Sequence, residues 1–232
     1  MMKKLWRWTW RILALLFVLI LFYQAWIFAH VWWWVDHNPS TSAFMEDRLE
    51  ALQSKNPDAE LQHQWVSYAK ISNNLKRALI AAEDAKFVDH EGFDWEGIGK
   101  AYEKNLKKGK IVAGGSTISQ QLAKNLFLST RRTPWRKGEE ALITVMLEKM
   151  MDKQRIFEIY LNVIEWGNGV FGAEAAARHY YRISAAQLSA DQAARLAAMV
   201  PNPRYYDKHR EARGLLRKTE IIFGRMNDAE IP

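Results

Sequence analysis

The sequence contains no cysteine among its 232 residues, and this absence removes several kinds of chemistry. Disulfide bonds, a zinc–thiolate site and a cysteine nucleophile are all excluded. Internal repeats and low-complexity segments are also lacking, and stretches that alternate apolar with polar residues are scarce. Because apolar residues instead recur at helical spacing through most of the chain, we expect a mainly α-helical protein.

Acidic residues are missing from the first 35 positions, which carry four basic ones, Lys3, Lys4, Arg7 and Arg11. The formal net charge of the whole chain is +7, so the remainder carries only +3. A surplus this small does not favour nucleic acid as a partner. The positions of the basic residues are therefore more informative than their total.

Residues 12–35 contain no Asp, Glu, Lys or Arg. A helix of this length extends about 36 Å, enough to cross a hydrocarbon core of about 30 Å, and tryptophans flank it on both sides like an aromatic belt. A cleaved signal peptide is the alternative. However, the run is longer than a typical signal core, and His37-Asn38-Pro39 stands where a small-x-small cleavage site would be. We therefore expect a retained transmembrane helix with its basic N-terminus in the cytoplasm.

These features divide the chain into four parts. Residues 1–11 form a basic cytoplasmic segment, residues 12–35 the transmembrane helix, residues 36–68 a polar connector, and residues 69–232 a helical domain. The last part is long enough to bury a core of its own.

A stretch rich in carboxylates, residues 82–95, follows a helical pattern of apolar residues and also holds three aromatic side chains. Leu75 and Leu79 belong to that pattern, so Glu83 is expected near the end of an apolar-faced helix that Gly92 terminates. Apolar surroundings raise the pKa of a carboxyl group towards the range that suits proton transfer. Taken alone, the stretch fits a solvated acidic helix end better.

Residues 114–126 indicate a glycine turn that leads into a helix, with Ser116 or Thr117 as its cap. Exposed N–H groups at such a turn bind anions, and the helix dipole favours negative charge there. One face of this helix carries Thr117, Gln121, Lys124 and Asn125. Such a face can hydrogen-bond a sugar and neutralise a phosphate, although a capped surface helix would show the same pattern. The Gly-x-x-x-x-Gly-Lys spacing of a nucleotide-binding loop is absent.

Basic residues dominate residues 100–138, where ten of them accompany one acid, Glu103. This run fits either a solvated face or a surface attracted to anionic lipid headgroups. Thr133-Pro134 indicates the start of a helix, and its first two turns carry Arg136, Lys137 and Glu140. A plain surface ion pair is the alternative for Arg136 and Glu140, although the base precedes the acid, which is the weaker order. A last helix, at about 211–226, is expected to serve in packing.

Four segments resemble, in the same order, the motifs of the family 51 glycosyltransferases, which are peptidoglycan glycosyltransferases. The segments are Glu83-Asp84-x-x-Phe87-x-x-His90-x-Gly92, Gly114-Gly115-Ser116-Thr117-Ile118-x-Gln120-Gln121-Leu122-x-Lys124-Asn125-Leu126, Arg136-Lys137-x-x-Glu140 and Lys153-x-x-Ile156-x-Glu158-x-Tyr160-Leu161-Asn162. The resemblance covers about residues 70–206 and implies a lysozyme-like, mostly α-helical domain behind the single N-terminal transmembrane helix. It also implies the monofunctional form, since the chain leaves no room for a transpeptidase domain.

The resemblance implies that the chain polymerises lipid II into β-1,4-linked glycan with inversion, taking the donor from undecaprenyl diphosphate. It nominates Glu83 as the base and Glu140 as the second catalytic carboxylate. The residues that it implies for substrate binding are Asp84, Phe87, His90, Gly115, Ser116, Thr117, Gln121, Lys124, Asn125, Arg136, Lys137 and Lys153. A divalent cation, Mg or Mn, at the diphosphate is left open, and so is whether Glu158, Tyr160 and Asn162 belong to the site or only support it.

By the same resemblance the protein lies in the inner membrane with its domain in the periplasm. Its partners would be lipid II, the growing glycan chain and membrane lipids, with other cell-wall synthesis proteins left open. Two rival functions are a membrane-anchored, lysozyme-like glycan hydrolase that uses the same two carboxylates, and a non-catalytic scaffold. The cations between residues 114 and 137 favour transfer from a diphosphate, because hydrolysis of a glycan does not need them.

Overall fold

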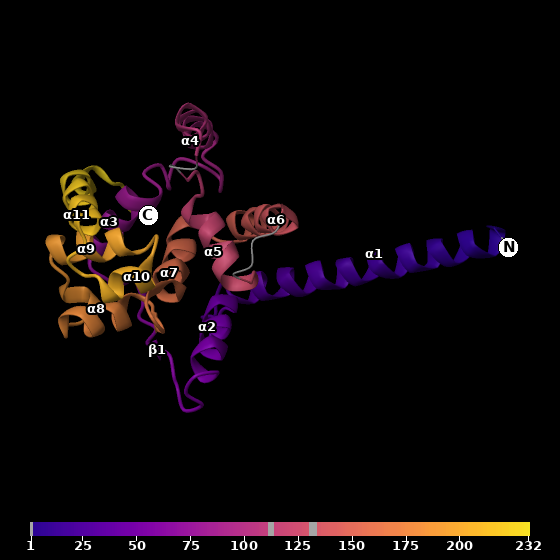
Figure 1. Ribbon diagram of the computed structural model, residues 1–232, viewed down its shortest axis with the longest axis horizontal. Helices are drawn as coiled ribbons and strands as arrows, with labels where there is room; N and C mark the ends of the chain where they lie inside the picture. The colour runs from indigo at the N-terminus through magenta and orange to yellow at the C-terminus, as the bar shows by residue number, and fades with distance from the viewer. Residues whose placement is uncertain (1, 111–113, 130–133) are drawn as a thin grey trace. The chain divides into compact units, whose positions relative to one another are not determined.

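The structure, a computed structural model, describes residues 2–110, 114–129 and 134–232. The chain divides after Asn38 into two compact units. The first unit holds one long helix, α1 (Met2–Trp33), and the second holds all the other elements (Figure 1). Three residues that we expect at or before the start of the third motif's helix lie outside the described residues. They are Arg131, Arg132 and Thr133.

Helix α1 contains the expected membrane-crossing segment. Its 28 residues from Trp6 to Trp33 are long and apolar enough to cross a membrane, and the described part of the chain has no second helix of this kind. The helix already includes the basic residues that precede this segment, and it ends at Trp33, two residues before the expected end. A single N-terminal apolar helix is thereby confirmed.

The second unit is almost entirely helical, as expected. Its helices are α2 (Ala43–Gln53), α3 (Asn73–Glu83), α4 (Trp95–Lys108), α5 (Ile118–Phe127), α6 (Pro134–Met150), α7 (Lys153–Val163), α8 (Ala173–Tyr181), α9 (Ala190–Met199), α10 (Pro203–Lys208) and α11 (Arg213–Arg225). Short 3₁₀ turns lie at η1 (Tyr68–Lys70), η2 (Ala185–Gln187) and η3 (Met226–Asp228), and short strands at β1 (Gln62–His63), β2 (Glu165–Gly167) and β3 (Val170–Phe171).

The three strands form one small sheet with β3 in the middle. Strand β1 runs parallel to β3, with Gln62 opposite Val170, and β2 runs antiparallel to it. Helix α2 packs against α5. Much of the segment expected as a connector, residues 36–68, is therefore part of the second unit, which begins at Pro39.

The core of the second unit forms around α3, α5 and α7. Helix α3 packs against α9 and α11, and α5 packs against α6 and α7. The largest fully buried side chains are Trp166, Tyr160, Phe87, Phe157 and Phe171. Leu75 and Leu79 of α3 are also fully buried, as the helical period predicts. This packing holds Glu83, the last residue of α3, at the edge of the core.

Gly92 does not end this helix, contrary to our expectation. Helix α3 already ends at Glu83, with Asp84 as its C-cap, and Gly92 lies in the loop that follows. Glycine is required at this position for two reasons. Its φ is +88°, and an added Cβ would lie 2.8 Å from Cγ2 of Thr144. The loop between α3 and α4 is thus pressed closely against α6.

Candidate active site

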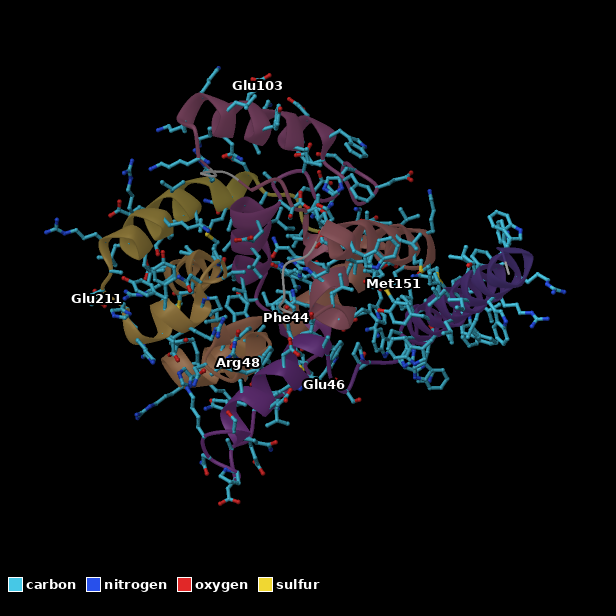
Figure 2. All side chains as sticks on the ribbon, turned by 45° about the vertical axis from the view of Figure 1, so that its right-hand side comes forward. Phe44, Glu46, Arg48, Glu103, Met151 and Glu211 are labelled. Atoms are coloured by element: carbon cyan, nitrogen blue, oxygen red, sulfur yellow. The ribbon has the colours of Figure 1, made fainter. Side chains whose placement is uncertain are left out.

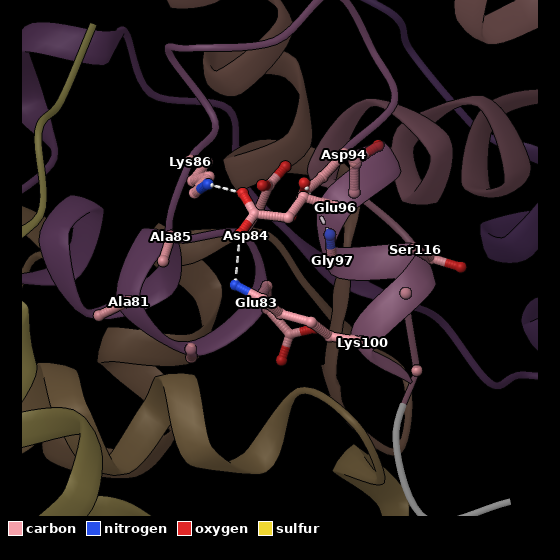
Figure 3. A pocket seen from close by; sticks show the side chains of 14 residues that line it. Ala81, Glu83, Asp84, Ala85, Lys86, Asp94, Glu96, Gly97, Lys100 and Ser116 are labelled. Carbon is pink, nitrogen blue, oxygen red and sulfur yellow. Dashed lines mark hydrogen bonds and ion pairs between the residues drawn. The ribbon is translucent and has the colours of Figure 1, made fainter. Parts of the chain in front are cut away.

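Two cavities adjoin at Ser116, which lines both of them. The Glu83 cavity has a volume of about 310 Å³ and lies between the end of α3, the loop after it, the start of α4 and residues 114–117 (Figure 3). The Lys124 cavity has a volume of about 470 Å³, and its walls come from α2, α5, α6, β2 and the turn between α9 and α10. Residues of the first and second motifs therefore line one cavity, residues of the second and third motifs line the other, and Ser116 is common to both.

The structure brings most of the predicted site residues together. Glu83, Asp84, Gly115, Ser116 and Thr117 line the Glu83 cavity, and Ser116, Gln121, Lys124, Asn125, Arg136, Lys137 and Glu140 line the Lys124 cavity. Both predicted carboxylates, Glu83 and Glu140, thus belong to the lining.

The two carboxylate oxygens of Glu83 have different surroundings. Oε2 accepts a hydrogen bond from Nε2 of Gln121 at 2.9 Å. Oε1 lies 3.7 Å from Nζ of Lys218 and accepts no hydrogen bond within the described part of the chain. Burial raises the pKa of Glu83, while the charge of Lys218, the hydrogen bond from Gln121 and the charge of Lys124 oppose this rise. A buried carboxylate with one oxygen that accepts no hydrogen bond is suited to accept a proton.

Asp84 ties the loop after α3 to the start of α5. Its Oδ2 accepts the backbone N–H of Ile118 at 3.0 Å, and its Oδ1 accepts from Nε2 of His90 at 3.0 Å. The other ring nitrogen of His90, Nδ1, accepts the backbone N–H of Gly92 at 3.1 Å. A carboxylate at the N-terminus of α5 is favourable to the helix dipole. Asp84 and His90 therefore hold the position of the neighbouring Glu83.

The residue that caps α5 is Thr117 and not Ser116. Its hydroxyl accepts the backbone N–H of Gln120, whose side chain in turn accepts the backbone N–H of Thr117, and this is a capping box. The same hydroxyl donates to the backbone oxygen of Gly92 at 2.7 Å. Ser116 is left at the junction of the two cavities, where Nζ of Lys137 lies 3.4 Å from its Oγ.

Positive side chains form one wall of the Lys124 cavity. Lys124 projects from α5, and burial lowers the pKa of its ammonium, an effect that the carboxylate of Glu140 opposes. Arg136 and Lys137 come from the first turn of α6, and Lys137 donates to the buried carboxylate of Glu140. Asn125 is fixed by its side-chain donation to the backbone oxygen of Gln121 at 2.7 Å. Three cations and one carboxylate leave this wall positive, which suits a diphosphate.

Phe87 and Lys153, expected among the substrate-binding residues, line neither cavity. The ring of Phe87 is fully buried and packs on Phe157, and the ammonium of Lys153 lies 4.7 Å from its centroid. Nζ of Lys153 also donates to Oε1 of Glu148 at 2.8 Å. Phe87 therefore supports the site from within the core, and Lys153, which is partly exposed, supports it through Glu148 and the ring of Phe87. His90 also lies outside the lining and acts through Asp84.

Lys218 of α11 is a site residue that the sequence did not indicate. Its helix was expected only to pack, and nothing in the local sequence connects it with Glu83. The sequence also did not indicate Phe44 and Glu165, which line the Lys124 cavity. The ring centroid of Phe44, on α2, lies 5.8 Å from Nζ of Lys124. Oε1 of Glu165 lies 2.8 Å from Nε of Arg48. Figure 2 shows Phe44 and Arg48 on the same helix. The Pro201-Asn202-Pro203 stop signal was the one local hint of this part of the lining.

A divalent metal held by the protein does not fit these residues. The described residues include no group of three or more His, Asp or Glu side chains that could hold a metal ion. Glu140 is moreover already paired with Lys137. A Mg or Mn ion would have to be held by substrate oxygens.

A buried carboxylate that lines one cavity, beside a second cavity walled by cations, fits an enzyme that transfers a group away from an anionic leaving group. A family model described as transglycosylase matches residues 49–227. The chain therefore belongs to the transglycosylase family, and it is a glycosyltransferase, as the four motifs predicted.

Relatives of high identity cover nearly the whole chain. A protein of Methylobacillus flagellatus is 76% identical over 223 residues, which cover 96% of this chain and 97% of the relative. One of Laribacter hongkongensis is 69% identical, with 97% and 99% covered, and one of Dechloromonas aromatica is 64% identical over the full length of both. All three are named biosynthetic peptidoglycan transglycosylase.

Proposed function

We propose that this protein is a membrane-anchored peptidoglycan glycosyltransferase that polymerises lipid II into β-1,4-linked glycan strands and releases undecaprenyl diphosphate. The observation that carries the proposal is that Ser116 lines both the cavity of Glu83 and the cavity walled by Lys124, Arg136 and Lys137. The names of the relatives agree with it.

In this mechanism the acceptor, lipid II, occupies the Glu83 cavity with its sugar 4-hydroxyl at Oε1 of Glu83. The carboxylate takes the hydroxyl proton while the oxygen forms a bond to the anomeric carbon of the donor. The bond from that carbon to the diphosphate oxygen breaks, and its electron pair leaves with the diphosphate. Attack from the side opposite the leaving group inverts α to β. The raised pKa of Glu83 makes it a stronger base than an exposed carboxylate.

The donor, a growing glycan on undecaprenyl diphosphate, occupies the Lys124 cavity. Its diphosphate is already a good leaving group, so it needs charge stabilisation more than protonation. Lys124, Arg136 and Lys137 supply that charge, and an arginine can hold two phosphate oxygens at once. Glu140 positions the ammonium of Lys137, with which it is paired. No step is assigned to a Mg or Mn ion, because the donor set does not fit one.

The same proposal places the protein in the inner membrane, with its N-terminus in the cytoplasm and its domain in the periplasm. The four basic residues before the apolar part of α1 support this orientation. A substrate with a polyisoprenoid tail stays in the bilayer, so membrane lipids are partners in the sense that the enzyme must work at their surface. The described residues assign no surface to other cell-wall synthesis proteins.

The test is to incubate the detergent-solubilised full chain with purified lipid II and to separate the products by size. We expect polymer from the wild type and none from Glu83→Gln, which keeps the shape of the side chain but cannot accept the proton. Glu50→Gln, an exposed change on α2, is the matched control and should polymerise normally.

Two outcomes would contradict the proposal. Fragmentation of pre-formed glycan strands without polymer formation would identify the hydrolase. Undiminished polymer from Glu83→Gln would remove Glu83 as the base.

A further inference from the structure

The side chains of the fourth motif serve two different places in the fold. Glu158 accepts the backbone N–H of Tyr68 at 2.8 Å, and Asn162 exchanges hydrogen bonds of 3.0 Å with the backbone of Val66. These two residues therefore hold the segment that enters the domain. Tyr160, which lies between them on α7, contacts Gln121 on α5 instead.

Two successive hydrogen bonds connect Tyr160 to Glu83 through the side chain of Gln121. Its hydroxyl donates to Oε1 of Gln121 at 3.1 Å, and Nε2 of Gln121 donates to Oε2 of Glu83 at 2.9 Å. The three residues come from α7, α5 and α3, so these hydrogen bonds join three helices of the core. Tyr160 is fully buried and lines neither cavity. Among the described residues its hydroxyl is hydrogen-bonded to Gln121 alone, so we expect it to act on the site through that amide.

The two ends of the Gln121 amide are not equivalent in this position. An ionised carboxylate only accepts hydrogen bonds, so Glu83 is stabilised by the NH₂ end of the amide and destabilised by its oxygen. A half-turn of the amide would exchange the two ends with little change of shape. Burial raises the pKa of Tyr160 well above its usual value, so its hydroxyl keeps its proton and can donate to the amide oxygen.

We propose that Tyr160 is a positioning residue of the transfer reaction: by donating to Oε1 of Gln121 it fixes the amide with its NH₂ end on Oε2 of Glu83. Oε2 is thereby occupied by the amide. We assign the acceptor's proton to the other oxygen, Oε1, which is buried, lies 3.7 Å from Nζ of Lys218 and accepts no hydrogen bond within the described residues. The inference rests on the proposed function, in which Glu83 is the base.

Other charges face Glu83 from the elements packed around it. Lys218 approaches from α11 and Lys124 from α5, and Asp84 follows it in the chain. The cavity in front of it is further lined by Lys86, Asp94, Glu96 and Lys100. The hydroxyl of Tyr160 is not hydrogen-bonded to any of these side chains in the described structure. Its removal therefore changes the surroundings of Glu83 through Gln121.

The test is the pH dependence of kcat/KM for lipid II polymerisation by the full-length Tyr160→Phe variant in detergent. Without the hydroxyl the amide can turn, its donation to Glu83 weakens, and the carboxylate holds its proton to higher pH. We expect the acid limb to move to higher pH, with roughly a three- to tenfold loss of kcat/KM on the acid side and recovery towards wild type at higher pH. The loss should appear in kcat more than in KM.

Tyr180→Phe is the matched control, because it also removes a tyrosine hydroxyl that donates inside the domain. That hydroxyl bonds the backbone oxygen of Trp166 at 2.9 Å and Oδ1 of Asp207 at 3.0 Å, and it lines neither cavity. Its acid limb should coincide with that of the wild type. If Tyr160→Phe lowers activity equally at every pH, the hydroxyl serves only the core and the assignment is overturned.

A second variant separates an effect through Gln121 from a direct one. Gln121→Met should move the acid limb in the same direction, and adding Tyr160→Phe to it should move the limb no further. An unmoved limb in Gln121→Met, or an additional shift in the double variant, would overturn the proposal. The proposal would also be overturned if Tyr160→Phe showed no cooperative thermal unfolding transition, because the hydroxyl would then serve the fold. A wild type that forms no polymer would instead defeat the proposed function.

Discussion

The role of base that we propose for Glu83 depends on burial and charge, which act on its carboxyl group in opposite directions. Burial raises the pKa of its carboxyl group, whereas Lys218, Gln121 and Lys124 favour the ionised form. Too much burial would leave the group protonated and unable to act, and too many cations would leave it a weak base. The ammonium of Lys218 lies 3.7 Å from Oε1, and its charge is the first of the effects that oppose burial.

Lys218→Met should therefore move the acid limb of kcat/KM to higher pH. The ammonium favours the carboxylate, so its loss raises the pKa of Glu83, and the protonated, inactive form persists to higher pH. We expect roughly a three- to tenfold lower kcat/KM on the acid side of the profile, measured with lipid II in detergent. Arg217→Met, an exposed neighbour on α11, is the control. A limb that moves to lower pH would contradict this account.

At the scale of elements, α5 organises the site. Its N-terminus is capped by Thr117 and receives the carboxylate of Asp84, while the side that lines the Lys124 cavity presents Gln121, Lys124 and Asn125. Its inner face is held to its neighbours by Glu148 of α6. That buried carboxylate accepts from Ser119 of α5 and from Lys153 of α7, so three helices meet at one carboxyl group.

Lys153→Met should lower stability rather than substrate affinity. It leaves the carboxylate of Glu148 buried without its cation, and we expect a loss of about 2–3 kcal/mol, below the roughly 3–5 kcal/mol of a fully buried pair because Lys153 is 20% exposed. Thermal unfolding measures the loss, and KM for lipid II should stay near that of the wild type. Lys149→Met breaks an exposed pair with Glu91 and should change little. A raised KM with unchanged stability would return Lys153 to the substrate-binding residues.

At the scale of the whole molecule, the proposed function requires the domain to meet a substrate that stays in the bilayer. Trp95, Tyr102 and Leu106 of α4 are 74%, 64% and 63% exposed, and their spacing places them on one face of the helix. Lys100, Lys104 and Lys108 fall on the opposite side by the same geometry. An exposed apolar stripe on a helix with many lysines suits the boundary between lipid headgroups and acyl chains.

Leu106→Cys, labelled with an environment-sensitive fluorophore, tests this contact in proteoliposomes. The chain has no other cysteine, so the label is specific. We expect a blue-shifted emission and quenching by brominated lipids at this position. Lys104→Cys, on the opposite side of α4, should give the emission of a label in water. Equal quenching at the two positions would show that the apolar stripe does not enter the lipid.

The sequence by itself determined the features that depend on neighbours along the chain. The membrane-crossing helix, the apolar face of α3, the capped start of α5 and the order of the four motifs all follow from local spacing, because helical period, capping and hydropathy act over a few residues. The four motifs were enough to single out Glu83, Glu140 and the cations as candidate site residues.

Only the tertiary structure decided which distant side chains meet. Lys218 approaches Glu83 and Tyr160 reaches Gln121. Phe87 turns into the core, and Lys153 turns towards Glu148 and the ring of Phe87 instead of the cavity. The motifs alone assigned Phe87 and Lys153 to the substrate, because a motif shows that residues belong together and not which way they face. That direction is set by how α3, α5, α7 and α11 pack, which depends on contacts between residues far apart in the chain.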